Sequence, residues 1–167
     1  MNIKLETLNL TQYDYNKHAS LKEKLTKGDS KSQYIYQISD RLEASTTASD
    51  SIYQRAFVIE DEGLAVGYLY ISNMIRDEVF LEYSILNEYR RMGYGSSVVY
   101  ETTDYLFENH NIRSVRLDID PSNKNSVLLA TSCGFTLDEE EYEKNNFIGK
   151  MQFVKESNCY VPKRRKY

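Results

Sequence analysis

Tryptophan, proline and cysteine are scarce in this sequence, and the scarcity limits what the protein can be. The 167 residues contain no Trp, 2 Pro, 2 Cys and only 7 Gly. The two cysteines, Cys133 and Cys159, are too few for a disulfide scaffold and lack the spacing of metal ligands. We therefore expect no metal site and a reduced, cytoplasmic setting.

Long apolar runs and an excess of positive charge are also missing. No apolar stretch reaches the 18 residues of a membrane helix, and the opening M-N-I-K-L-E-T-L-N-L lacks the apolar core of a signal peptide. The net charge of −4 argues against a general nucleic-acid binder. Length and a hydrophobic fraction of 41% fit one soluble domain. We predict a single domain over residues 1–157 and a basic tail over residues 158–167.

The hydrophobic periodicity predicts a mixed α/β fold. The expected strands are residues 3–8, 56–60, 65–72, 78–86, 114–120, 135–137 and 150–155, and the expected helices are 12–25, 33–42, 96–109 and 122–133. The strand–helix–strand unit from residue 78 to 120 implies one parallel pair within a mostly antiparallel sheet, with helices on both faces. The polar stretch A-S-T-T-A-S-D-S, residues 44–51, is either a mobile loop or a flap beside a substrate.

Two of the seven glycines, Gly93 and Gly95, lie one residue apart in N-E-Y-R-R-M-G-Y-G-S-S, residues 87–97. A tight turn from a strand into a helix exposes the first free N–H groups of that helix. Glycines there permit positive φ and remove side chains that would block a ligand. The helix N-terminus, with Arg90 and Arg91 beside it, favours phosphate. A plain turn with solvated arginines is the alternative, and the third glycine of a dinucleotide loop and the G-K-[ST] of a P-loop are missing.

A second motif follows the next predicted strand. Asn123 and Ser126 form N-x-x-S, and Gly134-Phe135 begins eleven residues after the Asn. Together with R-R-M-G-Y-G between a strand and a helix, this pattern resembles the GNAT superfamily of acyl-CoA-dependent N-acyltransferases over residues 56–137. The stretch Y-L-F-E-N-H-N-I-R-S-V-R-L-D-I-D-P-S-N-K-N-S most resembles the RimJ/RimL-type branch, which acetylates protein N-termini and small amines.

The resemblance implies acetyl-CoA as co-substrate and a set of groups that bind it. Main-chain N–H groups of the glycine turn would hold the pyrophosphate. Main-chain groups at the end of strand 78–86 would pair with the pantetheine arm, and Asn123 would hydrogen-bond to it. In this family the two parallel strands are splayed so that the acyl chain lies between them. The implied CoA-binding residues are Ile85, Leu86, Arg90, Arg91, Met92, Gly93, Tyr94, Gly95, Ser96 and Asn123.

Direct transfer to an amine needs a base, a polarised thioester carbonyl and a proton donor for the leaving thiolate. Many family members place a Tyr donor seven residues after the motif Asn, where this chain has Ala130. Ser126 is the nearest replacement, unless it only caps its own helix. Asp118 and Glu82 are the candidate bases, although a strand carboxylate is often simply solvated or salt-bridged.

The acceptor cannot be read from the sequence. The acidic run D-E-E-E-Y-E, residues 138–143, is either a solvated turn or an attractor for a cationic amine. The resemblance implies an N-acetyltransferase acting on a primary amine, either a protein N-terminus or a small cationic amine, in a family that often forms homodimers. A catalytically weak acyl-CoA sensor on the same fold is one alternative. An interaction domain whose glycine turn binds nothing is the other.

Overall fold

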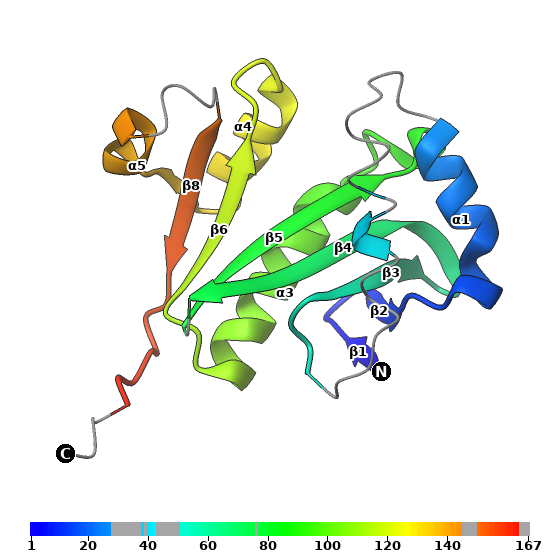
Figure 1. Cartoon of the computed structure of the whole chain (residues 1–167), viewed down its shortest axis with the longest axis horizontal. Coiled ribbons are helices and arrows are strands. Elements are labelled where there is room, and N and C mark those ends of the chain that lie inside the picture. The colour runs from blue at the N-terminus through cyan, green and yellow to red at the C-terminus, as the bar shows by residue number, and fades with distance from the viewer. Residues whose placement is uncertain (28–37, 39, 43–50, 76, 145–149, 164–167) are drawn as a thin grey trace.

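In the computed structural model the described residues are all except 28–37, 39, 43–50, 76, 145–149 and 164–167 (Figure 1). Within them, eight strands form one sheet in the order β1-β2-β3-β4-β5-β6-β8-β7. The strands are β1 (Asn2–Lys4), β2 (Asn9–Gln12), β3 (Arg55–Asp61), β4 (Leu64–Ile75), β5 (Glu78–Ile85), β6 (Ser114–Ile119), β7 (Thr136–Leu137) and β8 (Met151–Glu156). The helices are α1 (Tyr15–Lys27), the 3-10 turn η1 (Asn87–Tyr89), α3 (Tyr94–His110), α4 (Lys124–Ser132) and α5 (Glu139–Lys144).

The sheet is antiparallel except for the neighbours β5 and β6, which run parallel. This confirms the predicted mixed sheet. The parallel pairing covers only three residue pairs and ends at Phe80 opposite Arg116. Beyond that point the two strands diverge toward their C-terminal ends, where α4 follows β6 (Figure 1). The splayed pair that the family resemblance implied is therefore present.

Two elements differ from the sequence prediction. The expected first strand, residues 3–8, is instead a hairpin of β1 and β2, closed by a hydrogen bond of 2.9 Å from the Leu5 N–H to the Leu8 carbonyl. The acidic run contains the short helix α5, and the Asp138 carboxylate accepts a bond of 3.1 Å from the Glu141 N–H at its start. Most of the expected helix 33–42 and of the loop 44–51 lies outside the described residues.

Two hydrophobic clusters cover the two faces of the sheet. The first joins α3 to alternate residues of the strands and includes Leu81 and Ile85 of β5. The second joins α1 to the opposite face and includes Tyr68 and Tyr70 of β4. Because side chains alternate along a strand, β5 presents Glu82 to the α1 side and its odd-numbered residues to the α3 side. None of the helices in the described ranges is long and apolar enough to cross a membrane.

The residues after β8 contact the end of the splayed pair at which β5 and β6 are still hydrogen-bonded to each other. The Ser157 N–H donates to the Arg113 carbonyl at 2.8 Å, and the Tyr160 hydroxyl donates to the Asp77 carboxylate at 2.6 Å. This carboxylate has its pKa lowered, first by that hydrogen bond. The residues that follow the sheet are thus fastened to the turn where β5 begins.

Candidate functional site

The helix α3 begins with free N–H groups, as the glycine motif predicted. Its N-cap is Gly93, with φ +87°, and no side chain caps this end. The first bond of the helix runs from the Ser97 N–H to the Gly93 carbonyl at 3.0 Å. The N–H groups of Tyr94, Gly95 and Ser96 have no acceptor within the helix, because no residue precedes them at the required spacing. This end of α3 can bind an anion.

The two glycines of the motif serve different purposes. A Cβ on Gly93 would meet nothing within 4 Å, so this residue is open to solvent and its backbone angle is what requires glycine. A Cβ on Gly95 would lie 2.9 Å from Leu129 Cδ1 and 3.3 Å from Tyr83 Cε2. Gly95 thus lets α3 approach β5 and α4 closely, and its role in clearing space for a ligand stays a prediction.

The loop between β5 and α3 carries the two predicted arginines. The Arg90 Nε donates to the Ile85 carbonyl at 3.0 Å, so this side chain folds back on the end of β5. Arg91 adopts φ +62° and is exposed, and the neighbouring Met92 is 65% exposed. Two positive charges thus lie in the eight residues that separate β5 from the free N–H groups of α3.

Tyr94, the first residue of α3, anchors the turn through its side chain. Its hydroxyl donates to the Asp61 carboxylate at the end of β3, at 2.7 Å, and this bond raises the pKa of the tyrosine. Its ring meets Tyr89 edge-on, with the ring centroids 6.3 Å apart. These contacts fix the start of α3 to the end of the sheet.

The edge of β5 is open over its last residues. The Leu86 N–H donates to the Val66 carbonyl and the Leu86 carbonyl accepts from the Tyr89 N–H, both at 2.9 Å. The Leu86 N–H is therefore engaged within the fold, so its carbonyl, through a second lone pair, is the group of this residue that a pantetheine arm could use. Since main-chain groups alternate along a strand, those of Tyr83 and Ile85 face away from β4, toward the gap that β6 leaves.

Asn123 is the N-cap of α4, with its Oδ1 accepting from the Ser126 N–H at 3.2 Å. The alternative in which Ser126 caps this helix is thus wrong, because the cap is Asn123. A contact from Asn123 to a bound pantetheine would use its Nδ2 donor. The Ser126 hydroxyl instead interacts with the Tyr83 hydroxyl.

Tyr83 is a candidate that the sequence reasoning missed. Its side chain lies on the α3 side of β5, against Gly95 and near Ser126. Burial raises the pKa of its hydroxyl, against the opposing effect of the Ser126 hydrogen bond. Ala130, at the position where the family resemblance led us to look for a tyrosine, is fully buried. The alternation of β5 indicated that Tyr83 and Glu82 face opposite sides, but no sequence signal identified the face that meets α4.

Glu82 lies on the α1 side within a cluster of polar groups. Its Oε1 accepts from the Tyr68 hydroxyl at 3.2 Å, and its Oε2 lies 3.4 Å from the Arg41 Nε. The Arg41 guanidinium lies 4.9 Å from the centre of the Tyr70 ring. Tyr68 has its pKa raised, first by burial and then by the Glu82 charge, so its hydroxyl is a neutral donor to this carboxylate.

Asp118, the other candidate base, lies in β6 on the same side of the sheet as Glu82. Its neighbours Leu117 and Ile119 belong to the cluster under α3, so alternation directs Asp118 to the opposite side. Asp118 is exposed and accepts from Gln152 Nε2 at 3.1 Å. The two carboxylates thus border the α1 side of the splayed pair, one from each strand, whereas Ser126 and Tyr83 lie on the other side.

A network of charges lies where the splayed strands are still paired. Glu78 Oε1 lies 2.8 Å from Arg113 Nη2 and 3.3 Å from Arg116 Nη2, and it accepts from the Ser114 hydroxyl at 3.2 Å. Arg116 Nη1 also donates to Asp138 at 2.8 Å, which lowers the pKa of that carboxyl. Asp138, the first residue of the acidic run, therefore forms an ion pair within the fold.

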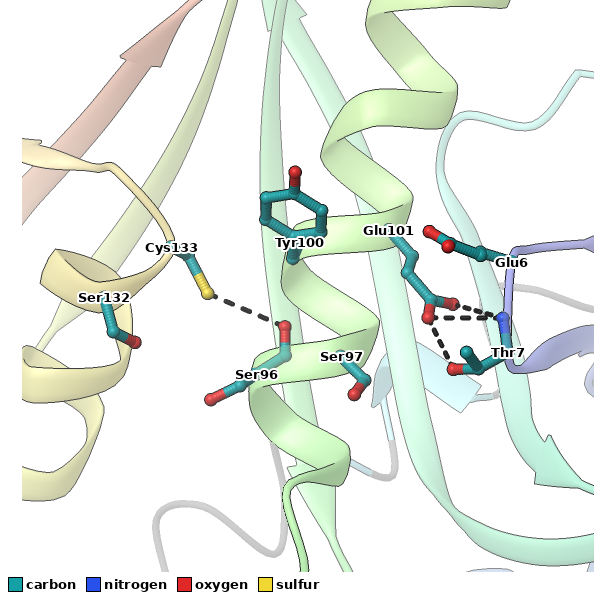
Figure 2. A pocket seen from close by; sticks show the side chains of 8 residues that line it. All are labelled: Glu6, Thr7, Ser96, Ser97, Tyr100, Glu101, Ser132 and Cys133. Carbon is teal, nitrogen blue, oxygen red and sulfur yellow. Dashed lines mark hydrogen bonds between the residues drawn. The ribbon is translucent and has the colours of Figure 1, made fainter.

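A hollow among the described residues lies beside this site and shares Ser96 with it. Its volume is about 320 Å³, and it lies between the first turns of α3, the end of α4 and the β1–β2 turn (Figure 2). Glu101 closes one side by accepting from the Thr7 N–H and hydroxyl, and the Cys133 Sγ lies 3.6 Å from the Ser96 carbonyl. The residues lining it are Glu6, Thr7, Ser96, Ser97, Tyr100, Glu101, Ser132 and Cys133.

Comparison with known proteins places this geometry in a family. A family model described as the acetyltransferase (GNAT) domain matches residues 9–136. No curated protein sequence matches the chain.

Several solved structures share the fold. An acetyltransferase from Agrobacterium tumefaciens has a TM-score of 0.74 at 16% identity, over 94% of this chain and 95% of that one. The RimL ribosomal L7/L12 α-N-protein acetyltransferase, in complex with coenzyme A, has a TM-score of 0.72 at 14% identity, over 95% and 99%. Mutant forms of the spermidine/spermine N-acetyltransferase SpeG from Vibrio cholerae have a TM-score of 0.64 at 15% identity, over 92% and 96%.

Proposed function

The chain belongs to the GNAT acetyltransferase family, and from this premise we propose that it moves an acetyl group from acetyl-CoA to a primary amine by direct transfer. The observation that carries the proposal is the open edge of β5 beside the uncapped start of α3. A strand edge and a helix N-terminus are the two main-chain sites that suit an amide-containing arm and a pyrophosphate. The structural neighbour in complex with coenzyme A supports the same co-substrate.

The donor would bind along the gap between β5 and β6. The N–H groups of residues 92–96 and the charges of Arg90 and Arg91 would hold the pyrophosphate. The gap-facing N–H of Ile85 would pair with the pantetheine, and the Ile85 carbonyl, which accepts from Arg90 Nε, has a second lone pair for the same purpose. Asn123 would contact the pantetheine from the other wall. This arrangement directs the thioester toward Tyr83, where the N–H facing the gap can donate to the carbonyl oxygen and polarise it.

The acceptor amine would approach from the α1 side. Attack on the thioester requires a neutral amine, so a base must take its proton, directly or through water. Glu82 suits this role better than Asp118 because it is partly buried and held in place by Tyr68 and Arg41. Asp118 is exposed and held by one amide. We therefore assign the base to Glu82 and retain Asp118 as its rival.

The acceptor class is a cationic primary amine, either a protein N-terminus or a small amine. Neighbours named for acetylating ribosomal protein N-termini and spermidine support this range. The exposed carboxylates of Glu139 and Glu140 in α5 give the outer edge of the sheet a negative charge, which attracts cations over several ångströms. The second candidate is an acyl-CoA sensor without turnover, and Ala130 is the observation that favours it.

Calorimetry with acetyl-CoA and a thiol-release assay over a panel of amines and peptides test the proposal. We expect saturable binding of acetyl-CoA and release of thiol with at least one cationic amine. Binding without turnover across the panel would favour the sensor, and the absence of binding at high micromolar acetyl-CoA would refute both candidates.

The base assignment is tested with two matched amide substitutions. Glu82→Gln should lower kcat by about 10²–10⁴-fold with little change in the Kd of acetyl-CoA, because only the proton transfer is lost. Asp118→Asn should leave kcat within a few-fold of the wild-type value. The reverse pattern would assign the base to Asp118.

A further inference from the structure

The departing thiolate is the part of the proposed reaction for which the family tyrosine is missing. When the bond between the carbonyl carbon and sulfur breaks, the electron pair stays on sulfur, and a hydrogen-bond donor there lowers the barrier. Ala130 has no donor and is fully buried. Any donor must therefore come from another residue that borders the gap between β5 and β6.

The Tyr83 side chain starts at the strand edge that borders this gap. Its main chain belongs to the part of β5 that has no β6 partner. Its ring passes under α3, where the Cβ position of Gly95 is 3.3 Å from Cε2 and 3.9 Å from the hydroxyl oxygen. The hydroxyl then meets Ser126 in the first turn of α4. The Tyr83 side chain thus reaches from the open edge of β5 to the first turn of α4.

The surroundings keep this hydroxyl neutral. The groups that act on it are Ser126, which donates or accepts a hydrogen bond, and Cys133, whose charged form would oppose a phenolate. Burial is the largest influence, and it raises the pKa of Tyr83. A neutral phenol carries its proton across the working pH range and remains a donor.

We propose that Tyr83 is the catalytic donor to the leaving thiolate of CoA, and that Ser126 positions its hydroxyl. The inference rests on the proposed function. In the step, the amine nitrogen bonds to the carbonyl carbon, the carbon–sulfur bond breaks, and sulfur keeps the electron pair. The Tyr83 O–H donates to this sulfur as its charge develops. The amine proton leaves to the base, and the CoA thiolate takes its own proton from water on release.

The protonation of the CoA thiol in the binary complex tests this without any acceptor. CoA labelled isotopically at the carbon beside the sulfur reports its thiol pKa by NMR, apart from the two cysteines of the protein. A hydrogen bond to a charged group is strong enough to shift that pKa by about one to two units. We expect the thiol pKa of bound CoA to be higher in Tyr83→Phe than in the wild type by this amount. Phenylalanine keeps the ring against Gly95, so the Kd of CoA should be unchanged.

Two controls make the result specific. Tyr105→Phe removes a hydroxyl from the distal part of α3 and should leave the thiol pKa at the wild-type value. Ser126→Ala should raise it by less than Tyr83→Phe does, because the donor remains and only its orientation loosens. An equal thiol pKa in wild type and Tyr83→Phe, with CoA bound to both, would overturn the inference while leaving the proposed function intact. Failure of wild type to bind CoA would refute the function itself.

Turnover gives a second readout that a structural role would not produce. Tyr83→Phe should lower kcat for acetyl-CoA by at least about tenfold. With the selenoester analogue of acetyl-CoA the loss should largely disappear, since a selenolate is a better leaving group and needs less stabilisation. An equal loss with both donors would contradict a role at the leaving group.

Discussion

At the scale of single residues, the two glycines of one motif are required for different physical reasons. Gly93 is required by its backbone angle of +87°, whereas Gly95 is required by the side chains of Leu129 and Tyr83. Only Gly93 therefore offers an open position beside the free N–H groups of α3. A substitution there can test the anion site without disturbing the core.

Gly93→Glu should abolish acetyl-CoA binding while the protein remains folded. The new carboxylate would lie beside the N–H groups of α3 and repel the pyrophosphate. The matched control is Gly93→Ala, which introduces the same backbone strain, about 1–2 kcal/mol, but no charge. We expect calorimetry to show binding in Gly93→Ala and none in Gly93→Glu, with unfolding midpoints of the two variants close together. Wild-type affinity in Gly93→Glu would exclude this turn as the phosphate site.

Single-residue roles could be predicted from the sequence only where the role depends on the main chain. The free N–H groups at the start of α3 follow from a strand, a glycine and a helix in succession, and the structure has them. Tyr83 could not be identified in this way. Its role depends on which side chain passes under Gly95 and meets Ser126, and this contact joins three elements that are distant in the sequence.

At the scale of elements, prediction succeeded where the periodic segments were long. The helix predicted over residues 96–109 is α3, and the strand predicted over residues 114–120 is β6, each within one or two residues at either end. The β1–β2 hairpin was missed because its strands have three and four residues, too few to show alternation on both sides of a turn. In α5, six mostly acidic residues carry no apolar stripe that would distinguish a helix from a turn.

His110, the last residue of α3, should make the stability of the protein depend on pH. His110 packs against Tyr53 and Tyr105, with ring centroids 6.2 and 5.5 Å away, and burial lowers its pKa from 6.5. Between the lowered value and 6.5 the unfolded chain binds more protons than the folded one, so stability falls as the pH drops through this window. Urea unfolding at a series of pH values should show this loss in the wild type and a smaller one in His110→Phe.

The control for this measurement is the other histidine. His18 accepts a hydrogen bond of 2.9 Å from the Asp14 N–H in the first turn of α1. His18→Gln should lower stability at every pH but retain the slope that His110 produces. A slope that persists unchanged in His110→Phe would assign it to another group.

At the scale of the whole molecule, the fold places the two halves of the proposed reaction on opposite faces of one sheet. The α3 face carries the proposed anion site, Tyr83 and Ser126, and the α1 face carries Glu82 and Asp118. Within the described residues the two faces meet at the gap between β5 and β6, whose position depends on where the parallel pairing stops. The sequence predicted the parallel pair from chain order, but it could not predict that pairing ends at Phe80 and Arg116, because that limit depends on side chains from several strands.

Arg116 holds this junction together. Its side chain is 14% exposed and joins Glu78 of β5, which is 8% exposed, to Asp138 beyond β7. Glu78 keeps Arg113 and the Ser114 hydroxyl as partners when Arg116 is removed, whereas Asp138 loses its arginine. Arg116→Met should therefore lower the free energy of unfolding by about 2 kcal/mol in a urea titration, between the cost of an exposed ion pair and that of a fully buried one. Its Nε has no hydrogen-bond partner among the described residues, so the loss arises at the two Nη atoms.

Two further variants separate the buried charge from the general effect of losing an arginine at this end of the sheet. Arg113→Met removes a neighbour of Glu78 that is 42% exposed, and its ion pairs should contribute only about 1 kcal/mol. Adding Glu78→Gln to Arg116→Met removes a carboxylate that has lost one of its two arginines and should recover part of the lost stability. If Arg116→Met costs no more than Arg113→Met, the limit of the β5–β6 pairing is set by the main chain and by apolar packing instead of this charge network. The acetyl-CoA affinity of the folded fraction should not change in either case, because these side chains lie at the closed end of the gap.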